Sequence, residues 1–195
     1  MEIYNHVIKF NLWGMNMSEK IKRLNRELVY KGTILDIYSD TMDVGNGKIE
    51  KWDFVAHRKG AACIVPVLPD GKILMVRQYR NALERDTLEI PAGARDSVTE
   101  DTMVCAVREL EEETGYKSDK VSKLLELRTT VAFCNEMVDV YLAEDLYPGE
   151  QHLDDAEDIR VEAHELSELL DMIYSGTMQD AKTVAAILAY ANKVK

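Results

Sequence analysis

The sequence predicts an α+β fold in which helices cover a mixed β-sheet. Short runs rich in β-branched and aromatic residues, which favour strands, recur between residues 23 and 164. Apolar residues at helical spacing occur in the middle of the chain and again near its end. Because 46% of the 195 residues are hydrophobic, the chain can also bury a substantial core. Its length corresponds to one domain, with or without a small extension.

The N-terminal part divides into two segments. Residues 1–22 are expected to form a short or poorly ordered segment, with Met17 as an alternative start. They lack the basic region, the clean apolar run and the cleavage site of a secretory signal. Residues 23–56 are expected to form a small antiparallel β extension with a turn at Asn46-Gly47. A sheet this small is marginal alone, so it needs a packing surface from its own chain or from a second one.

The remainder, residues 57–195, alternates strands and helices. Residues 61–68 and 72–79 flank a Pro-Asp-Gly turn and are expected to pair as a hairpin. The other expected strands are residues 88–90, 123–130, 137–143 and 159–164, and the closing helices are residues 165–174 and 179–193. No stretch approaches the roughly 18 apolar residues that cross a bilayer. We therefore expect a mixed sheet with helices packed on it and no membrane partner.

The charge and cysteine content of the chain limit its partners. A formal net charge of −11 and an isoelectric point near 4.9 argue against binding to nucleic acid or to an anionic membrane surface. Cys63, Cys105 and Cys134 are odd in number and lack the spacing of a zinc site. Reduced thiols and a cytoplasmic location are therefore expected.

The segment with apolar residues from Met103 onward, which stops at Gly115, is predicted to form an amphipathic helix that is acidic toward its C-terminal end. Gly115 stands where a left-handed residue would end such a helix. Ser97 and Glu100 have the spacing of a capping box at its start, and Thr99 is the alternative cap.

Three glutamates of this helix, Glu109, Glu112 and Glu113, fall within one sector of about 100°. Like charges at this spacing cost roughly 0.2–0.5 kcal/mol per pair. The negative end of the helix dipole disfavours each anion by a further ~0.3–1 kcal/mol. A solvated acidic face is the simplest alternative, but a chain that accepts both penalties is predicted to store negative charge for a cation. Carboxylate oxygens suit Mg²⁺, with Mn²⁺ as the second choice.

The charged residues around this helix resemble the Nudix box, the signature of hydrolases that cleave nucleoside diphosphates linked to another moiety. The matching residues are Gly93-x6-Glu100-x7-Arg108-Glu109-Leu110-x-Glu112-Glu113-x-Gly115-Tyr116. The usual pattern has five residues between the glycine and the first glutamate, whereas this chain has six. Either Ala94 occupies the glycine position or the loop holds one extra residue. The resemblance implies a Nudix-type α/β/α sandwich with a mixed sheet for residues 57–195.

Further segments are similar to the ADP-ribose pyrophosphatase branch of that family. They are Glu89-Ile90-Pro91-Ala92-Gly93, Phe133-Cys134-Asn135-Glu136, the acidic loop 152–158, the segment 175–183 and the N-terminal β extension. This resemblance implies metal-dependent hydrolysis of a small nucleoside diphosphate derivative, ADP-ribose, to AMP and ribose 5-phosphate. It also implies a homodimer in which the N-terminal sheets of residues 23–56 are swapped. The alternatives are hydrolysis of another nucleotide sugar such as GDP-mannose, or a non-catalytic nucleotide sensor with the same fold.

These arguments assign roles to individual residues. The expected metal ligands, the last two of them by resemblance, are Glu109, Glu112, Glu113, the carbonyl of Ala92 and Glu157. Asp155 is the expected general base, which must lie within hydrogen-bonding reach of the attacking water. Arg108 and Glu112 complete the catalytic set, because a guanidinium group can hold two carboxylates in place. Glu100 is assigned a structural role, as partner of Arg108 or of the helix cap.

Three residues are expected to contact substrate. Arg80 lies at a predicted strand end near the loop before the acidic helix, where it could clamp a pyrophosphate or a ribose. A surface salt bridge is the alternative for this arginine. Trp52 and Phe133 could stack on a nucleobase, although aromatic residues in strands more often pack in a core. The four histidines lack zinc-like pairing, and no role is assigned to them.

Overall fold

The computed structural model describes residues 21–153 and 158–195. Its strands are β1 (Lys22–Lys31), β2 (Leu35–Asp43), β3 (Ile49–His57), β4 (Ala61–Pro66), β5 (Ile73–Arg80), β6 (Arg85–Glu89), β7 (Ala92–Ala94), β8 (Tyr116–Lys117), β9 (Lys120–Arg128), β10 (Met137–Glu144), β11 (Tyr147–Pro148) and β12 (Arg160–His164). Its helices are α1 (Thr102–Thr114), α2 (Leu166–Tyr174) and α3 (Ala181–Lys193). The predicted α+β class is confirmed.

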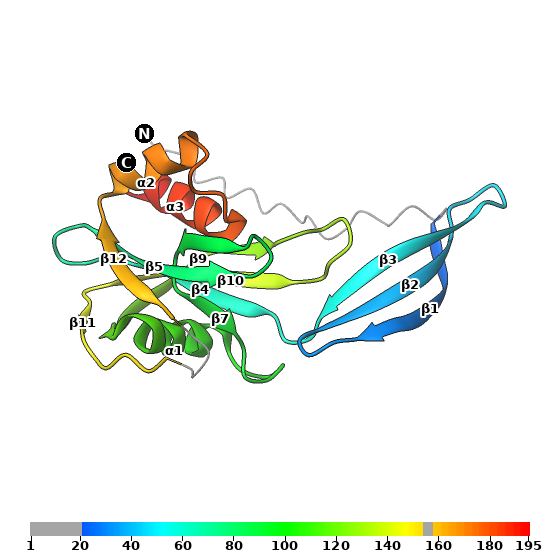
Figure 1. The fold of residues 1–195 in the computed structure, drawn as a ribbon, viewed down its shortest axis with the longest axis horizontal. Coiled ribbons are helices and arrows are strands. Elements are labelled where there is room, and N and C mark those ends of the chain that lie inside the picture. The colour runs from blue at the N-terminus through cyan, green and yellow to red at the C-terminus, as the bar shows by residue number, and fades with distance from the viewer. Residues whose placement is uncertain (1–20, 154–157) are drawn as a thin grey trace, which may run out of the picture.

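The N-terminal strands form a separate antiparallel sheet in the order β1-β2-β3, which projects from one end of the molecule (Figure 1). The predicted turn between β2 and β3 is present, with Asn46 and Gly47 both at positive φ. The sheet meets the rest of the chain at Val55, which exchanges backbone hydrogen bonds with Phe133 (2.7 Å) and Asn135 (3.3 Å).

The rest of the chain holds a mixed sheet and a second, antiparallel one. Strand β4 runs parallel to β10 and antiparallel to β7, while β9 completes the mixed sheet. The second sheet has the order β12-β5-β6. Helix α1 lies on one side of these sheets, and α2 and α3 lie on the other (Figure 1). This arrangement is the α/β/α sandwich that the sequence led us to expect.

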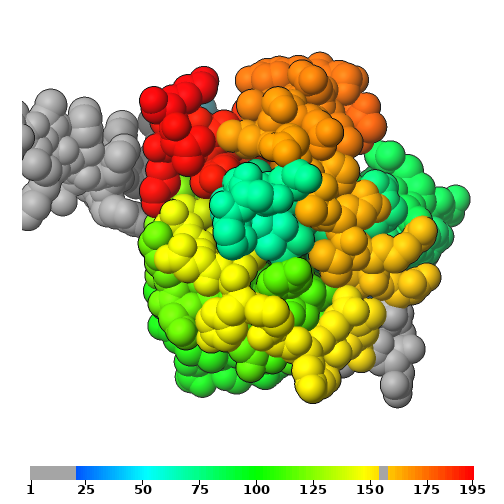
Figure 2. Space-filling view, turned by 90° about the vertical axis from the view of Figure 1, so that its left-hand side faces the viewer, coloured from blue at the N-terminus to red at the C-terminus, as the bar shows by residue number. Residues whose placement is uncertain are grey.

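The predicted hairpin between residues 61–68 and 72–79 is wrong beyond its turn. Leu68 N–H donates to the Lys72 carbonyl (2.8 Å), and a single bridge pairs Val67 with Ile73. Strand β4 then has β10 on one edge and β7 on the other, so it has no edge left for β5. Strand β5 instead enters the second sheet. Figure 2 shows the end of the molecule at which the β4–β5 turn lies. The turn, around residue 70 (teal), lies between the C-terminal segments and the yellow segment near residue 150.

Two hydrophobic cores fill the layers on either side of the mixed sheet. Successive residues of β4 alternate between them, because side chains of a strand point to opposite faces. Cys63 and Val65 join the core that includes Leu169 of α2 and Ile187 of α3. On the other face, Ala62 and Ile64 pack with Cys105, Ala106 and Leu110 of α1. Helix α1 is thus held by its apolar stripe, which leaves its acidic side free to face the end of β7.

The start of α1 differs from the prediction. Asp101 is the N-cap, and its carboxylate accepts a hydrogen bond from Met103 N–H (2.8 Å). Ser97 instead accepts from Glu100 N–H (3.1 Å) within the preceding turn, so the expected capping box closes the loop and not the helix. The predicted end is confirmed, because Gly115 has φ 71° and its N–H donates to the Glu111 carbonyl (2.8 Å).

In the described residues, no helix is long and apolar enough to cross a bilayer.

Candidate active site

The short strand β7 brings the loop before α1 against the acidic side of that helix. Gly93 lies so close to Glu109 that a Cβ at this position would stand 2.0 Å from Glu109 Oε1. A side chain at position 93 would therefore displace the Glu109 carboxylate.

Glu113 fixes the backbone of the same strand. Its carboxylate accepts a hydrogen bond from Ala92 N–H (3.0 Å), and its side chain is almost fully buried. A carboxylate buried at the C-terminal end of a helix is costly without compensation. The hydrogen bond from Ala92 N–H is one source of that compensation. It also fixes the backbone at Ala92, whose own carbonyl is the expected metal ligand.

Arg108 connects the remaining acidic residues. Its Nη1 atom donates to Glu109 (2.7 Å) and Glu112 (2.8 Å), and Nη2 donates to the Ala94 carbonyl (3.2 Å). Its Nε lies 3.5 Å from a carboxylate oxygen of Glu100, the structural partner expected from the sequence. Partial burial alone would lower the pKa of Arg108, but the Glu112 hydrogen bond and the Glu109 charge raise it. The arginine therefore stays charged and holds two carboxylates in fixed positions.

The donor set around Ala92 and the α1 glutamates fits a hard divalent cation. It consists of carboxylate and carbonyl oxygens, two of the carboxylates are largely buried, and they belong to one helix face. Within residues 21–153 and 158–195, however, no three His, Cys, Asp or Glu side chains already converge as a metal-binding group. Arg108 lies between Glu109 and Glu112 in this arrangement. Asp155 and Glu157, the expected base and additional ligand, lie outside the described residues.

A cavity of about 390 Å³ opens beside β7. Its lining includes the backbone of Ala92–Ala94 together with Arg80, His57, Glu136 and Lys182. Arg80 therefore lines the same cavity as the Ala92–Ala94 segment. No role was assigned to His57 or Glu136 from the sequence, because a lone histidine or glutamate gives no indication of a binding or catalytic role. Here Glu136 accepts a hydrogen bond from Thr129 (2.7 Å), which anchors its carboxylate on the cavity wall.

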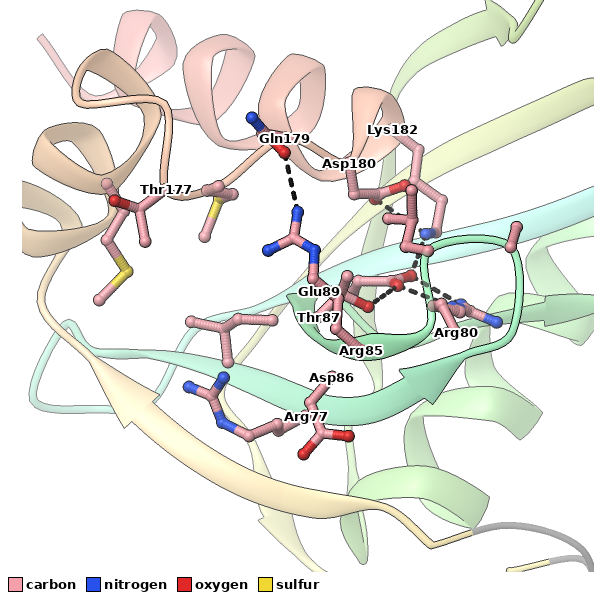
Figure 3. Close-up of a pocket in the computed structure, with 15 residues that line it drawn as sticks. Arg77, Arg80, Arg85, Asp86, Thr87, Glu89, Thr177, Gln179, Asp180 and Lys182 are labelled. Carbon is pink, nitrogen blue, oxygen red and sulfur yellow. Dashed lines mark hydrogen bonds and ion pairs between the residues drawn. The ribbon is translucent and has the colours of Figure 1, made fainter.

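The guanidinium of Arg80 is held by Glu89, a buried residue that the sequence did not single out as functional. Arg80 donates two hydrogen bonds to Glu89 (2.7 and 2.6 Å), and Lys182 and Thr87 also donate to this carboxylate (Figure 3). Burial by itself would raise the pKa of Glu89, but the hydrogen bond from Arg80 and the charge of Lys182 lower it to about 2. Glu89 is therefore ionised across the physiological range and holds two cations at the edge of the cavity.

Lys182 and Thr183 link this carboxylate to the start of α3. Lys182 pairs with Asp180 (2.8 Å), the N-cap of the helix, which also accepts from Thr183 N–H (3.0 Å). The Thr183 hydroxyl in turn accepts a hydrogen bond from Ile90 N–H (3.1 Å). Residues 180–183, the last part of the segment 175–183 that resembles the ADP-ribose pyrophosphatase branch, thus support the loop that carries Ala92.

Trp52 and Phe133 lie together, but not in the cavity beside β7. They line a separate hollow of about 780 Å³ between the N-terminal sheet and the segment 131–135. Both rings are about half exposed, at 42% and 50%. Within one chain, Trp52 and Phe133 therefore line the same hollow, whereas Arg80 lines a different cavity.

The fold and the acidic helix define the class of protein to which the chain belongs. The NUDIX domain family matches residues 57–187. The chain is 39% identical over 168 residues to an ADP-ribose pyrophosphatase of Bacillus subtilis (strain 168), covering 85% of this chain and 90% of that protein. It is 34% identical over 168 residues to a methanol dehydrogenase activator of Bacillus methanolicus, with the same coverage.

A solved structure has the same fold. The crystal structure of an ADP compounds hydrolase superimposes with a TM-score of 0.82 at 23% identity, covering 90% of this chain and 95% of that one. The chain belongs to the Nudix family and is a pyrophosphohydrolase of that family. Members of the family generally require a divalent metal ion.

Proposed function

We propose that the protein hydrolyses ADP-ribose to AMP and ribose 5-phosphate with Mg²⁺, or with Mn²⁺ as the alternative cation. The observation that carries this proposal is the acidic face of α1 packed against the Ala92–Ala94 backbone, beside a cavity that contains Arg80. The similarity to the Bacillus subtilis ADP-ribose pyrophosphatase supports the choice of substrate. A cytoplasmic location is part of the same proposal and rests on the unpaired cysteines of the described chain.

The chain's own residues supply the binding and orientation that such a reaction needs. Glu109, Glu112, Glu113 and the Ala92 carbonyl would hold the cation, which when bound neutralises the diphosphate and lowers the pKa of a water molecule. Arg108 keeps Glu109 and Glu112 at fixed positions through its hydrogen bonds. Asp155 is proposed to accept the proton of the attacking water, with Glu157 as a further ligand.

Arg80 is proposed to bind the diphosphate or the adjoining ribose at the cavity edge. Glu89 holds the guanidinium plane through two hydrogen bonds, so little side-chain freedom remains to be lost when substrate binds. The side chain of Arg80 is still 40% exposed, which leaves part of it accessible from the cavity. The pair thus presents a preorganised cation in a chain that is otherwise strongly acidic.

The separation of Trp52 and Phe133 from Arg80 leads us to propose that the site is completed by a second copy of the chain. The N-terminal sheet exposes large apolar side chains, namely Leu24, Leu28, Val29, Tyr30, Ile34 and Ile49. Exposed apolar surface of this extent marks an interaction face. A homodimer with swapped N-terminal sheets would cover that surface and bring the aromatic residues of one subunit to the catalytic cavity of the other.

A substrate panel tests this function directly. ADP-ribose, GDP-mannose, ADP-glucose and ATP are incubated separately with Mg²⁺, and the products are separated and identified by chromatography. ADP-ribose is expected to have the highest kcat/KM and to yield AMP and ribose 5-phosphate in equal amounts. A clear preference for GDP-mannose or ATP would overturn the substrate assignment and leave the family assignment intact. Lack of turnover for every compound would support the non-catalytic sensor instead.

A further inference from the structure

A second cavity, of about 370 Å³, lies between the turn that joins β5 to β6 and the connection from α2 to α3. Figure 3 shows Arg85 extending from the first of these segments toward Gln179 in the second. Among the described residues, none of those predicted from the sequence to bind metal or nucleobase lines this cavity. Arg80, Asp180 and Lys182 contribute to its wall and also to the wall of the candidate catalytic cavity. The two cavities are therefore neighbours joined by one ion-pair network.

Among the described residues, the cations in the wall of the second cavity differ in how they are neutralised. Arg77 forms a two-point ion pair with Glu162, and Arg80 and Lys182 share Glu89. Arg85 donates instead to the neutral side chain of Gln179, whose Oε1 accepts at 2.8 Å. Across residues 21–153 and 158–195, no carboxylate lies within ion-pair distance of Arg85. Arg85 is exposed, and in a chain of net charge −11 an arginine held in place by a neutral partner is suited to bind an anion.

The wall also has apolar residues. Leu83 and Leu88 come from the β5–β6 region, and Met172 and Met178 come from α2 and the connection that follows it. Methionine side chains adapt to flat or irregular ligands, and their sulfur atoms make favourable contacts with aromatic rings. A volume of about 370 Å³ lies in the range of small-molecule sites, which combine an apolar lining with a few polar anchors. The cavity therefore suits an organic body that bears a single anionic group.

We propose that this cavity binds a nucleoside monophosphate, with its phosphate on Arg85 and its base against Met172 and Met178. A guanidinium fork matches phosphate geometry, and the apolar lining favours an aromatic base over a bare sugar. The choice of AMP rests on the proposed function, because AMP would be a product of the neighbouring site. Ribose 5-phosphate carries the same anionic group but lacks an aromatic ring to cover the methionines. The cavity thus distinguishes between the two products of the proposed reaction.

The experiment reports from within the cavity and needs no turnover. Protein labelled with ¹³C at the methionine methyl groups is titrated with AMP in the presence of chelator, and Met172 and Met178 are assigned from their leucine variants. We expect both methyl resonances to shift saturably. Arg85→Gln should weaken the Kd by at least ~10-fold, as for loss of a charge-assisted hydrogen bond. Lys193→Gln removes the same charge from the far end of α3 and should leave the Kd unchanged.

Two further ligands separate the contributions to binding. Adenosine tests the apolar wall and inorganic phosphate tests Arg85, and each alone should bind at least ~10-fold more weakly than AMP. The proposal is overturned if the two resonances do not shift, if Arg85→Gln binds AMP as tightly as the parent protein, or if inorganic phosphate alone matches AMP. Because AMP is added directly, failure of the protein to hydrolyse ADP-ribose would refute the proposed function without affecting this result.

Discussion

At the scale of single residues, the acidic face of α1 gives the sharpest tests. Glu112 faces Arg108 in the candidate site, whereas Glu111 points to the other side of the helix and pairs with Lys117 (2.8 Å). The two neighbours are chemically identical and differ only in the side of α1 on which they lie. A comparison of their glutamine variants therefore separates a catalytic role from a general effect of charge.

We predict that Glu112→Gln lowers kcat/KM for ADP-ribose by at least ~10²-fold, because it removes an anion proposed to hold the cation that stabilises the transition state. Glu111→Gln should retain nearly full activity. Excess chelator should abolish turnover by the parent protein, and added Mg²⁺ should restore it. Steady-state kinetics over a range of Mg²⁺ concentrations measures all three effects, and full activity in chelator would refute the metal-dependent mechanism.

Glu89 leads to a prediction about pH. The pKa of Glu89 in the folded protein is about 2, compared with an ordinary glutamate value of 4.5. Because the folded-state pKa is lowered, the stabilisation by this carboxylate is complete above about pH 4.5 and is lost as the pH falls toward 2. We predict that Glu89→Gln lowers the free energy of unfolding by about 3 kcal/mol at pH 7. The difference from the parent protein should shrink as the pH falls below 4.5.

Urea unfolding between pH 7 and pH 3 measures this difference. Glu84→Gln, at an exposed position in the preceding turn, is the matched control and should leave the free energy of unfolding unchanged at every pH. A Glu89→Gln deficit that stays constant over the whole range would show that the buried ion pairs with Arg80 and Lys182 are not its source.

At the scale of elements, the decisive contact is the one between β7 and α1. Gly93 abuts the Glu109 carboxylate, and its neighbour Ala94 in the same short strand is exposed. Gly93 does not have a positive φ, so alanine can adopt its backbone conformation. The effect of a methyl group at this position is therefore confined to displacement of Glu109.

We predict that Gly93→Ala lowers kcat/KM by at least ~10-fold and raises the Mg²⁺ concentration needed for half-maximal activity. A ligand displaced by about 1 Å is sufficient for losses of this size. The melting temperature should change little, because the carboxylate end of Glu109 can move aside. Ala94→Ser is the control for the strand. Unchanged metal activation in Gly93→Ala would show that Glu109 does not take part in cation binding.

At the scale of the whole molecule, the N-terminal sheet sets the expected assembly. Its three strands pair with one another and contact the remainder through the short junction around Val55 and Phe133 (Figure 1). A three-stranded sheet with exposed apolar residues has little independent stability. Its burial against a second copy of the chain would remove the exposed surface in a symmetric manner.

We predict that the full chain is a dimer at micromolar concentration in light scattering. Deletion of residues 1–54 should give aggregated or inactive protein, because it removes the proposed interface and the aromatic wall that includes Trp52. Detection of a monomer that hydrolyses substrate at the normal rate would contradict the swapped assembly. That outcome would leave the catalytic role of the α1 glutamates unaffected.

Local features of this protein could be predicted from the sequence because they depend on residues close together in the chain. The helical spacing of apolar residues and the Gly115 stop predicted α1 and its end. The Asn46-Gly47 turn was predicted in the same way, and the clustered charges indicated Glu109, Glu112 and Glu113 as the candidate ligands.

Other features were decided only by the tertiary structure. Strands β4 and β5 separate because β4 finds partners on both edges, one of them the distant β10, and no local pattern records that competition. Glu89 and Lys182 meet across 93 residues of sequence, and a side chain at position 93 would meet Glu109 only because α1 brings that residue against β7. Periodicity and turn residues in the sequence predicted the helix α1 and the turn, and the clustered charges predicted its acidic face. Burial across the whole molecule determined which elements pair and which charges meet.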